Sequence, residues 1–209
     1  MTLNFEKTIK TIAIICFYLL LFILARAGLS QVPRYILGFV FDFICFYIFK
    51  KELIDKFKEE LHDFKINVWL GVKLIFITYF VSSLFLFILF YFMGNNEEYA
   101  RLIYKGSRIT IFTIFTDILI FPIIEEIFYR FILYNYLKDK IKHNIIIIFL
   151  ISFLFSIVHI HTKLRLFFWS LFVTYIYSKT KKLTVVITFH ILTVVISYIL
   201  MYYFVEINI

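Results

Sequence analysis

The sequence predicts an all-α fold, a polytopic transmembrane helical bundle of about seven spans, six to eight at roughly 20 residues each. This bundle would form a single integral membrane domain over residues 1–209. The composition is the first observation behind this prediction. Of the 209 residues, 63% are hydrophobic and the mean hydropathy is +0.93, whereas soluble globular domains are about half apolar. The second is that the apolar residues form long runs with short connections.

The N-terminal part contains two apolar runs and one soluble stretch. The runs cover residues 9–24 and 33–49, and the stretch at 50–65 mixes Lys with Glu and Asp. We expect this stretch to form an amphipathic helix on the membrane surface, because its apolar residues recur at helical spacing. These residues are Leu53, Ile54, Phe57 and Leu61.

Five further apolar runs complete the predicted bundle. They cover residues 68–93, 109–137, 145–160, 164–177 and 183–205. The run at 164–177 is short for a membrane span. The sequence contains no repeat and no linker to a second domain, so we expect one domain.

The net charge of +8 has a different meaning here than in a soluble protein. The cations lie in short loops, where they set topology and contact membrane lipids. No basic face exists outside the membrane, so nucleic acid is excluded as a partner. The distribution of Lys and Arg favours a cytoplasmic N-terminus, and the bias toward Phe, Ile, Lys and Asn favours a bacterial cell membrane.

Cys16 and Cys45 lie in apolar runs and predict neither a disulfide nor a zinc cluster.

Two adjacent glutamates lie inside an apolar run. A carboxylate in a lipid-embedded helix costs roughly 2.5–3.5 kcal/mol, so such residues are kept where they face a polar cavity. Glu126 stands four residues before Arg130, the favourable order for an ion pair on one helix face. Glu125 is rotated about 100° from Glu126, so we expect it to face a different space and to be available as a general base. Pro122 predicts that a helix or a kink begins just before the pair.

Two histidines in later runs complete a candidate site. His159 follows Phe155 by one helical turn, and His190 lies early in the last run. A neutral imidazole can accept a proton from water, donate to an oxyanion or bind a metal. Each feature alone also has a structural explanation, such as a Glu–Arg pair that joins helices or a histidine at a membrane edge. Together they form the set that water activation in a membrane cavity requires.

These residues resemble the motifs of the CPBP family, the CAAX prenyl proteases and bacteriocin-processing enzymes also called Abi. That family is recognised by E-E-x-x-x-R, F-x-x-x-H and H-x-x-x-N. The resemblance covers residues 118–195 as a catalytic motif region, and it implies an intramembrane endopeptidase that cleaves a membrane-associated peptide or protein. The matching residues are Glu125, Glu126 and Arg130, then Phe155 and His159, then His190.

The resemblance also implies a role for each residue. Glu125 would activate the attacking water with His159 as a partner in proton transfer, and His190 would stabilise the oxyanion or help to hold a metal. Glu126 and Arg130 would orient the site. The family has been described both as metalloproteases and as glutamate-type proteases. This sequence has no H-E-x-x-H, and Glu125, His159 and His190 would be a minimal zinc set.

The third motif departs from the family pattern, because Val194 stands where the family usually has Asn. Losing one oxyanion donor typically costs about 2.7–4 kcal/mol of transition-state stabilisation, although Thr193 can substitute as a donor. The departure keeps an alternative open, namely a weak or inactive relative that acts as a membrane scaffold or a bacteriocin-immunity protein. A small transporter that uses Glu125 and Glu126 as a proton or cation site would show internal symmetry, which the sequence lacks.

A simple seven-span arrangement separates the candidate residues. It places Glu125 and His159 nearer the outer side and His190 seven residues, or roughly 10 Å, from the inner side. A shared site therefore requires tilted helices, a short or re-entrant run at 164–177, or a shifted boundary near Pro122.

Overall fold

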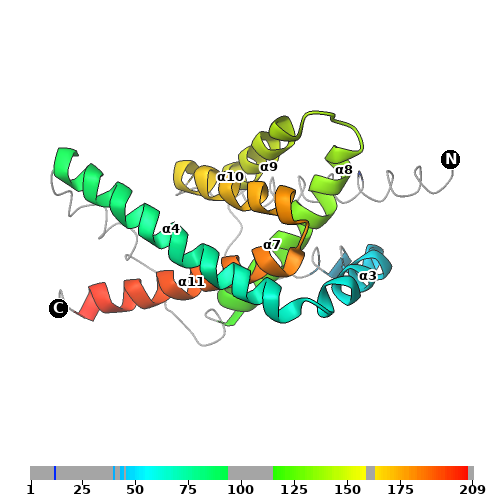
Figure 1. Ribbon diagram of the computed structural model, residues 1–209, viewed down its shortest axis with the longest axis horizontal. Coiled ribbons are helices and arrows are strands. Elements are labelled where there is room, and N and C mark those ends of the chain that lie inside the picture. The colour runs from blue at the N-terminus through cyan, green and yellow to red at the C-terminus, as the bar shows by residue number, and fades with distance from the viewer. Residues whose placement is uncertain are drawn as a thin grey trace.

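The described part of the chain is helical and contains no β-strand, in agreement with the predicted all-α class. The structure is a computed structural model that describes residues 12, 40, 43, 44, 46–93, 115–158 and 163–206, with only the backbone given at 79–93, 158, 163 and 200–206. Figure 1 shows how the elements are arranged. They are α3 (Lys50–Leu61), α4 (Phe64–Met93), the π-helix η1 (Thr116–Ile120), α7 (Phe121–Glu126), the π-helix η2 (Ile127–Leu133), α8 (Tyr134–Lys138), α9 (Asn144–Val158), α10 (Lys163–Thr180) and α11 (Leu183–Glu206).

The later predicted runs correspond to helices. The bounds of α4, α9, α10 and α11 lie close to those of four runs. Cys16, Cys45 and most of the runs at 9–24 and 33–49 lie outside the described residues. Among the helices that are described, none combines the length and the apolarity needed to cross a membrane. The predicted number of spans stays a prediction.

The helix α3 is amphipathic in a different way from the one predicted. It ends at Leu61, and only Leu53 of its four predicted apolar positions is buried, whereas Leu61 is 70% exposed. The buried face instead joins Leu53 to Glu60, seven residues later and therefore two turns along the same side of the helix. A carboxylate thus lies buried on the same side of α3 as Leu53, at a position that the predicted apolar set did not include.

A continuous helical segment from Thr116 to Lys138 changes its hydrogen-bonding pattern along its length. Pro122 lies in the first turn of α7, where its missing N–H leaves no bond to the carbonyl four residues earlier. Just before it, the Phe121 N–H bonds the carbonyl of Thr116, five residues back, which is the wider π spacing. We expected a helix or a kink to begin near Pro122; the α-helical element α7 does begin at Phe121, but within a segment that is already helical from Thr116.

The two long helices α4 and α11 lie side by side, and a glycine allows their close approach (Figure 1). A Cβ atom at Gly71 would lie 2.9 Å from Thr188 Cβ and 3.0 Å from the Val185 carbonyl oxygen. Small residues at a helix contact let the two backbones approach closely, because the neighbouring helix fills the space that a larger side chain would occupy.

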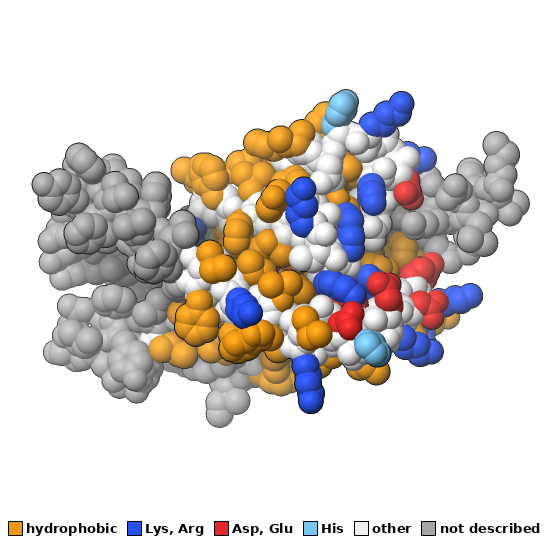
Figure 2. Space-filling model, in the orientation of Figure 1, with side chains coloured by type: hydrophobic (Ala, Val, Ile, Leu, Met, Phe, Trp, Pro, Cys, Tyr) orange, Lys and Arg blue, Asp and Glu red, His pale blue; other side chains and the backbone are white. Residues whose placement is uncertain are grey.

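Aromatic and aliphatic side chains from η2, α8, α9, α10 and α11 form most of the core. Its largest fully buried members include Tyr129, Tyr134, Phe155, Tyr177 and Phe189. Large hydrophobic side chains also stay exposed on the outer faces of α4, α9 and α10. On the face shown in Figure 2, they cover much of the described surface, whereas the acidic side chains gather at the end of the molecule that carries α3.

Candidate functional site

Glu126 and Arg130 form a buried ion pair where α7 meets η2. Arg130 Nη1 lies 3.2 Å from Glu126 Oε1, and neither side chain is exposed. Arg130 Nη2 also donates a hydrogen bond of 3.0 Å to Ser170 Oγ on α10. Desolvating two charges costs several kcal/mol per ion, and the mutual attraction together with this further bond offsets much of that cost. The pair that the four-residue spacing predicts is confirmed.

Three aromatic rings surround the Arg130 guanidinium. Its central carbon lies 5.0 Å from the ring centroid of Phe155, 5.6 Å from that of Trp169 and 5.7 Å from that of Tyr129. Cations are attracted to the electron-rich ring faces, and the attraction is strongest where water is excluded. Phe155 of the second motif therefore packs against the arginine of the first motif.

His190 on α11 lies between the two glutamates of α7. Its Nδ1 forms a hydrogen bond of 2.9 Å with Glu126 Oε1, and its Nε2 lies 3.8 Å from Glu125 Oε2. The imidazole also packs on Trp169, with 4.4 Å between the ring centroids. The contacts of the imidazole thus include two carboxylates and an indole ring.

The two glutamates differ in exposure but not in the residue that they approach. The Glu125 side chain is 27% exposed, whereas that of Glu126 is fully buried. We expected Glu125 to face a different space, but both carboxylates approach the same imidazole. The rotation of Glu125 from Glu126 fits their different exposures, but it gave no indication that a side chain from α11 lies between the two positions.

The hydrogen bond to Glu126 determines which nitrogen of His190 carries the proton. A carboxylate paired with Arg130 is an acceptor, so Nδ1 must be the donor in this contact. In the neutral imidazole, Nε2 then has a free lone pair on the side of Glu125. Only the doubly protonated ring would donate a hydrogen bond from Nε2.

The remaining predicted residues are placed as follows. His159 lies outside the described residues. The Thr193 hydroxyl donates to the carbonyl of Phe189 on its own helix, at 2.8 Å. Thr193 would have to release this bond to act as an oxyanion donor in place of the Asn that Val194 replaces.

The donor atoms fit part of a metal site. At a tetrahedral zinc ion, a nitrogen and an oxygen ligand lie about 3.4 Å apart, close to the 3.8 Å between His190 Nε2 and Glu125 Oε2. A carboxylate that holds the other imidazole nitrogen, as Glu126 does, is the usual partner of a metal-binding histidine. Within the described residues, no three His, Cys, Asp or Glu side chains form a metal-binding group. A third ligand, for which His159 is the predicted residue, would lie outside them.

The comparison with protein families identifies this region. Residues 107–196 match the family model described as type II CAAX prenyl endopeptidase Rce1-like. This match supports the CPBP family for this part of the chain. The CPBP match contains the whole predicted motif region 118–195 and begins after α4. No curated protein and no solved structure matches the chain.

The CPBP match supports a general function and a location. It supports a function of the CAAX-type intramembrane protease kind and substrates that are membrane-associated peptides or proteins. Because the family is membrane-embedded, it also supports an integral membrane protein. Its matched range excludes α3, so the contacts between α3 and α11 lie partly outside the family region.

Several polar residues at or near the site were not predicted from the sequence. Trp169 and Ser170 contact His190 and Arg130 from α10, and nothing in their local pattern marks them. Asp117 on η1 accepts a hydrogen bond of 2.6 Å from the Tyr198 hydroxyl on α11. Asp117 could have been found, since it is a carboxylate in the same apolar run as the two glutamates.

Proposed function

We propose that this protein is an intramembrane endopeptidase that hydrolyses a peptide bond in a membrane-associated protein or peptide. The observation that carries the proposal is the placement of His190 between Glu125 and Glu126 inside the region that matches the CPBP family. The buried ion pair of Glu126 and Arg130 gives this arrangement a fixed support. Glu125 is the more exposed carboxylate and is the one we assign to the reacting water.

Glu125 acts as the general base in this proposal. Its carboxylate accepts a proton from the water as the water oxygen attacks the scissile carbonyl. Glu126 keeps the Nδ1 proton of His190 in place and thereby directs Nε2 toward the reacting water. His159 assists the proton transfer, and the proton reaches the leaving amine when the tetrahedral intermediate collapses.

The same residues can hold a divalent metal such as zinc. Glu125 Oε2 and His190 Nε2 would supply two ligands and His159 the third. A zinc ion in such a site lowers the pKa of a bound water to about 7 and polarises a carbonyl. In either variant of the mechanism, Glu126 and Arg130 orient His190 and do not contact the substrate.

The test is the effect of Glu125→Gln on membrane peptides. This substitution keeps the shape of the side chain and removes its ability to act as a base. We expect peptides that the wild-type chain releases to disappear in this variant, as measured by comparative peptidomics of membranes from cells that express each form. Glu52→Gln, an exposed position on α3, is the matched control and should leave the peptides unchanged. Undiminished release by Glu125→Gln would refute the proposal.

A second candidate function is a non-catalytic membrane scaffold or bacteriocin-immunity protein. Val194 in the place of the usual Asn favours it, as does the bond that engages the Thr193 hydroxyl. Removing one oxyanion donor costs about 2.7–4 kcal/mol, a 10²–10³-fold loss in kcat. A scaffold would keep its full biological effect in the Glu125→Gln variant, whereas an endopeptidase would lose it.

A further inference from the structure

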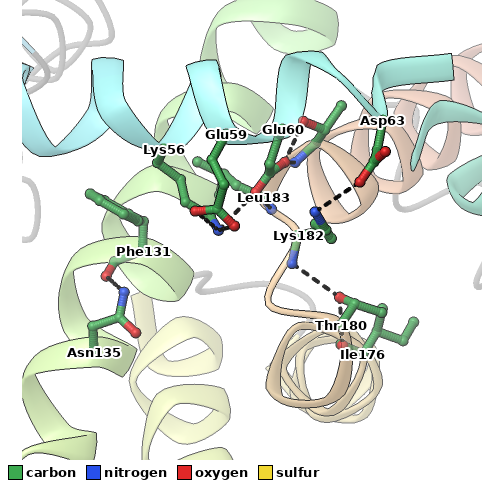
Figure 3. A network of polar contacts seen from close by, with 11 residues as sticks. Lys56, Glu59, Glu60, Asp63, Phe131, Asn135, Ile176, Thr180, Lys182 and Leu183 are labelled. Atoms are coloured by element: carbon green, nitrogen blue, oxygen red, sulfur yellow. Dashed lines mark hydrogen bonds and ion pairs between the residues drawn. The ribbon is translucent and has the colours of Figure 1, made fainter. Parts of the chain in front are cut away.

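Glu60 connects the surface helix α3 to the helix that carries His190. It lies in the last turn of α3, and it is 1% exposed. Its Oε1 accepts a hydrogen bond of 2.7 Å from the Leu183 N–H. Its Oε2 accepts bonds of 2.7 Å and 2.5 Å from the Thr184 N–H and hydroxyl. Figure 3 shows this carboxylate facing the first residues of α11.

This contact is a helix cap supplied by a distant residue. The first N–H groups of a helix have no partner inside the helix, and the aligned peptide dipoles place partial positive charge there. A buried carboxylate that accepts these N–H groups makes charge-assisted bonds, which are shorter and stronger than neutral ones. Lys56 lies 3.4 Å from Glu60 Oε1 and compensates the buried charge.

The capped end of α11 is close to the candidate site. His190 follows Leu183 by seven residues, which is two turns and about 10 Å along the helix. Between them, Thr188 and the Val185 carbonyl pack against Gly71 of α4. A change in the axial position or rotation of α11 would therefore move the imidazole relative to both glutamates.

We infer that Glu60 is a positioning residue of the endopeptidase site, acting through α11 on His190. Its carboxylate fixes the start of α11 and thereby the register in which His190 meets Glu125 and Glu126. This inference rests on the proposed function for its catalytic consequence, but the positioning itself can be observed without any substrate. Because Glu60 lies outside residues 107–196, the family match does not include it.

The experiment compares Glu60→Gln with Glu59→Gln in the full chain in detergent micelles. Glu59 is the matched control, since it also pairs with Lys56, at 3.1 Å, but is 62% exposed and has no bond to α11. The first readout is the nitrogen NMR spectrum of labelled histidine side chains, with the His190 signals identified by their loss in His190→Gln. It reports the tautomer of this imidazole and the position of its two nitrogens relative to Glu125 and Glu126.

We expect Glu60→Gln to move the His190 signals, and Glu59→Gln to leave them unchanged. The Gln amide keeps one acceptor and turns an N–H₂ group toward a backbone N–H. Unchanged His190 signals in a folded Glu60→Gln protein would overturn the inference. Thr184→Ala removes only the hydroxyl bond and should shift the same signals by a smaller amount; it also provides a test if Glu60→Gln does not fold.

The second readout is cleavage of a quenched fluorescent peptide with a prenylated C-terminal CAAX sequence. We expect Glu60→Gln to lower kcat about ten- to hundredfold and to change KM by less than about twofold, because a displaced His190 loses its alignment with the reacting water and not substrate affinity. An equal loss in Glu59→Gln would overturn the inference. If the wild-type chain does not cleave this peptide, the NMR readout still decides whether Glu60 positions His190, so the two proposals fail separately.

Discussion

At the scale of single residues, Arg130 holds the site together. It pairs with Glu126, donates to Ser170 and lies among three aromatic rings, without exposed surface. Glu126 in turn fixes Nδ1 of His190. Polar contacts therefore connect α10, η2, α7 and α11 in that order. Each contact restricts the orientation of the side chains that it joins.

Replacing Arg130 with Met should destabilise the protein by about 3–5 kcal/mol, because it leaves the Glu126 carboxylate buried without its counterion. The free energy of unfolding, measured by circular dichroism in detergent with a chemical denaturant, gives the loss. The double variant Glu126→Gln with Arg130→Met should lose less than the sum of the two single variants, since no unpaired charge remains. Additive losses would contradict the account of a coupled pair.

At the scale of elements, the contact between α4 and α11 depends on one glycine. Gly71→Ala would normally stabilise a helix interior by roughly 0.5–1 kcal/mol. Here the added methyl group would overlap a side chain and a carbonyl oxygen of α11, so we expect a net destabilisation of about 1–3 kcal/mol. The melting temperature measures it. A higher melting temperature in Gly71→Ala would contradict this prediction, because it would mean that α4 and α11 can move apart to accommodate the methyl group at little cost.

The turn between α10 and α11 contains a lysine with an altered titration. Lys181 has a positive φ of 54°, and its Nζ donates to the Tyr134 hydroxyl at 2.7 Å. Burial, together with a smaller contribution from the repulsion of Lys138, lowers the pKa of Lys181 to about 8. The unfolded chain keeps this group protonated up to its ordinary pKa of 10.5.

The consequence is a stability that rises with pH in an alkaline window. Between about pH 8 and 10.5 the unfolded state binds more protons at Lys181 than the folded state, so the free energy of unfolding increases. Denaturant titrations at a series of pH values measure this slope. Lys181→Met should flatten it, whereas Lys179→Met, an exposed position in the last turn of α10, should keep it.

At the scale of the whole molecule, the described surface is largely apolar on α4, α9 and α10. Large exposed apolar areas are rare on soluble monomers and mark contacts with a membrane or with other proteins. Because the CPBP family is membrane-embedded, these faces fit a lipid environment. The charged end with α3 then fits the aqueous boundary.

Apolar faces buried in lipid predict how the protein responds when membranes are extracted with alkaline carbonate or with detergent. Alkaline carbonate removes peripheral proteins from membranes and leaves integral ones in the pellet, because only the latter bury apolar surface in lipid. We expect the full chain to remain in the pellet and to be released by detergent. Release by carbonate alone would contradict an integral membrane protein.

Local patterns predicted the short-range features of the site. The spacing of Glu126 and Arg130 and the place of Pro122 follow from the geometry of one helix, and both agree with the structure. The approach of His190 to Glu125 was in conflict with a simple arrangement of parallel spans. That arrangement gave no account of helix tilt, which decides the distances between residues on different helices.

The long-range features could not be predicted from periodicity. Glu60 and Leu183 are 123 positions apart, and the apolar set predicted for α3 did not include Glu60. Trp169 contacts His190 only because α10 packs against the site, and its own neighbours carry no motif. Gly71 was one small residue in an apolar run. Each owes its role to a neighbour that the sequence does not identify.

The π-helix η2 has a consequence for insertions and deletions. It closes with the Tyr134 N–H bonded to the carbonyl of Tyr129, five residues earlier, so this stretch holds one residue more than an α-helix of equal length would. Deleting one residue from 127–133 would restore α-helical spacing, and because the wide turn had absorbed that residue, the segment upstream would keep nearly the same orientation relative to α8. The two glutamates would then still face the imidazole, whereas the same deletion in a regular α-helix would turn them by about 100°.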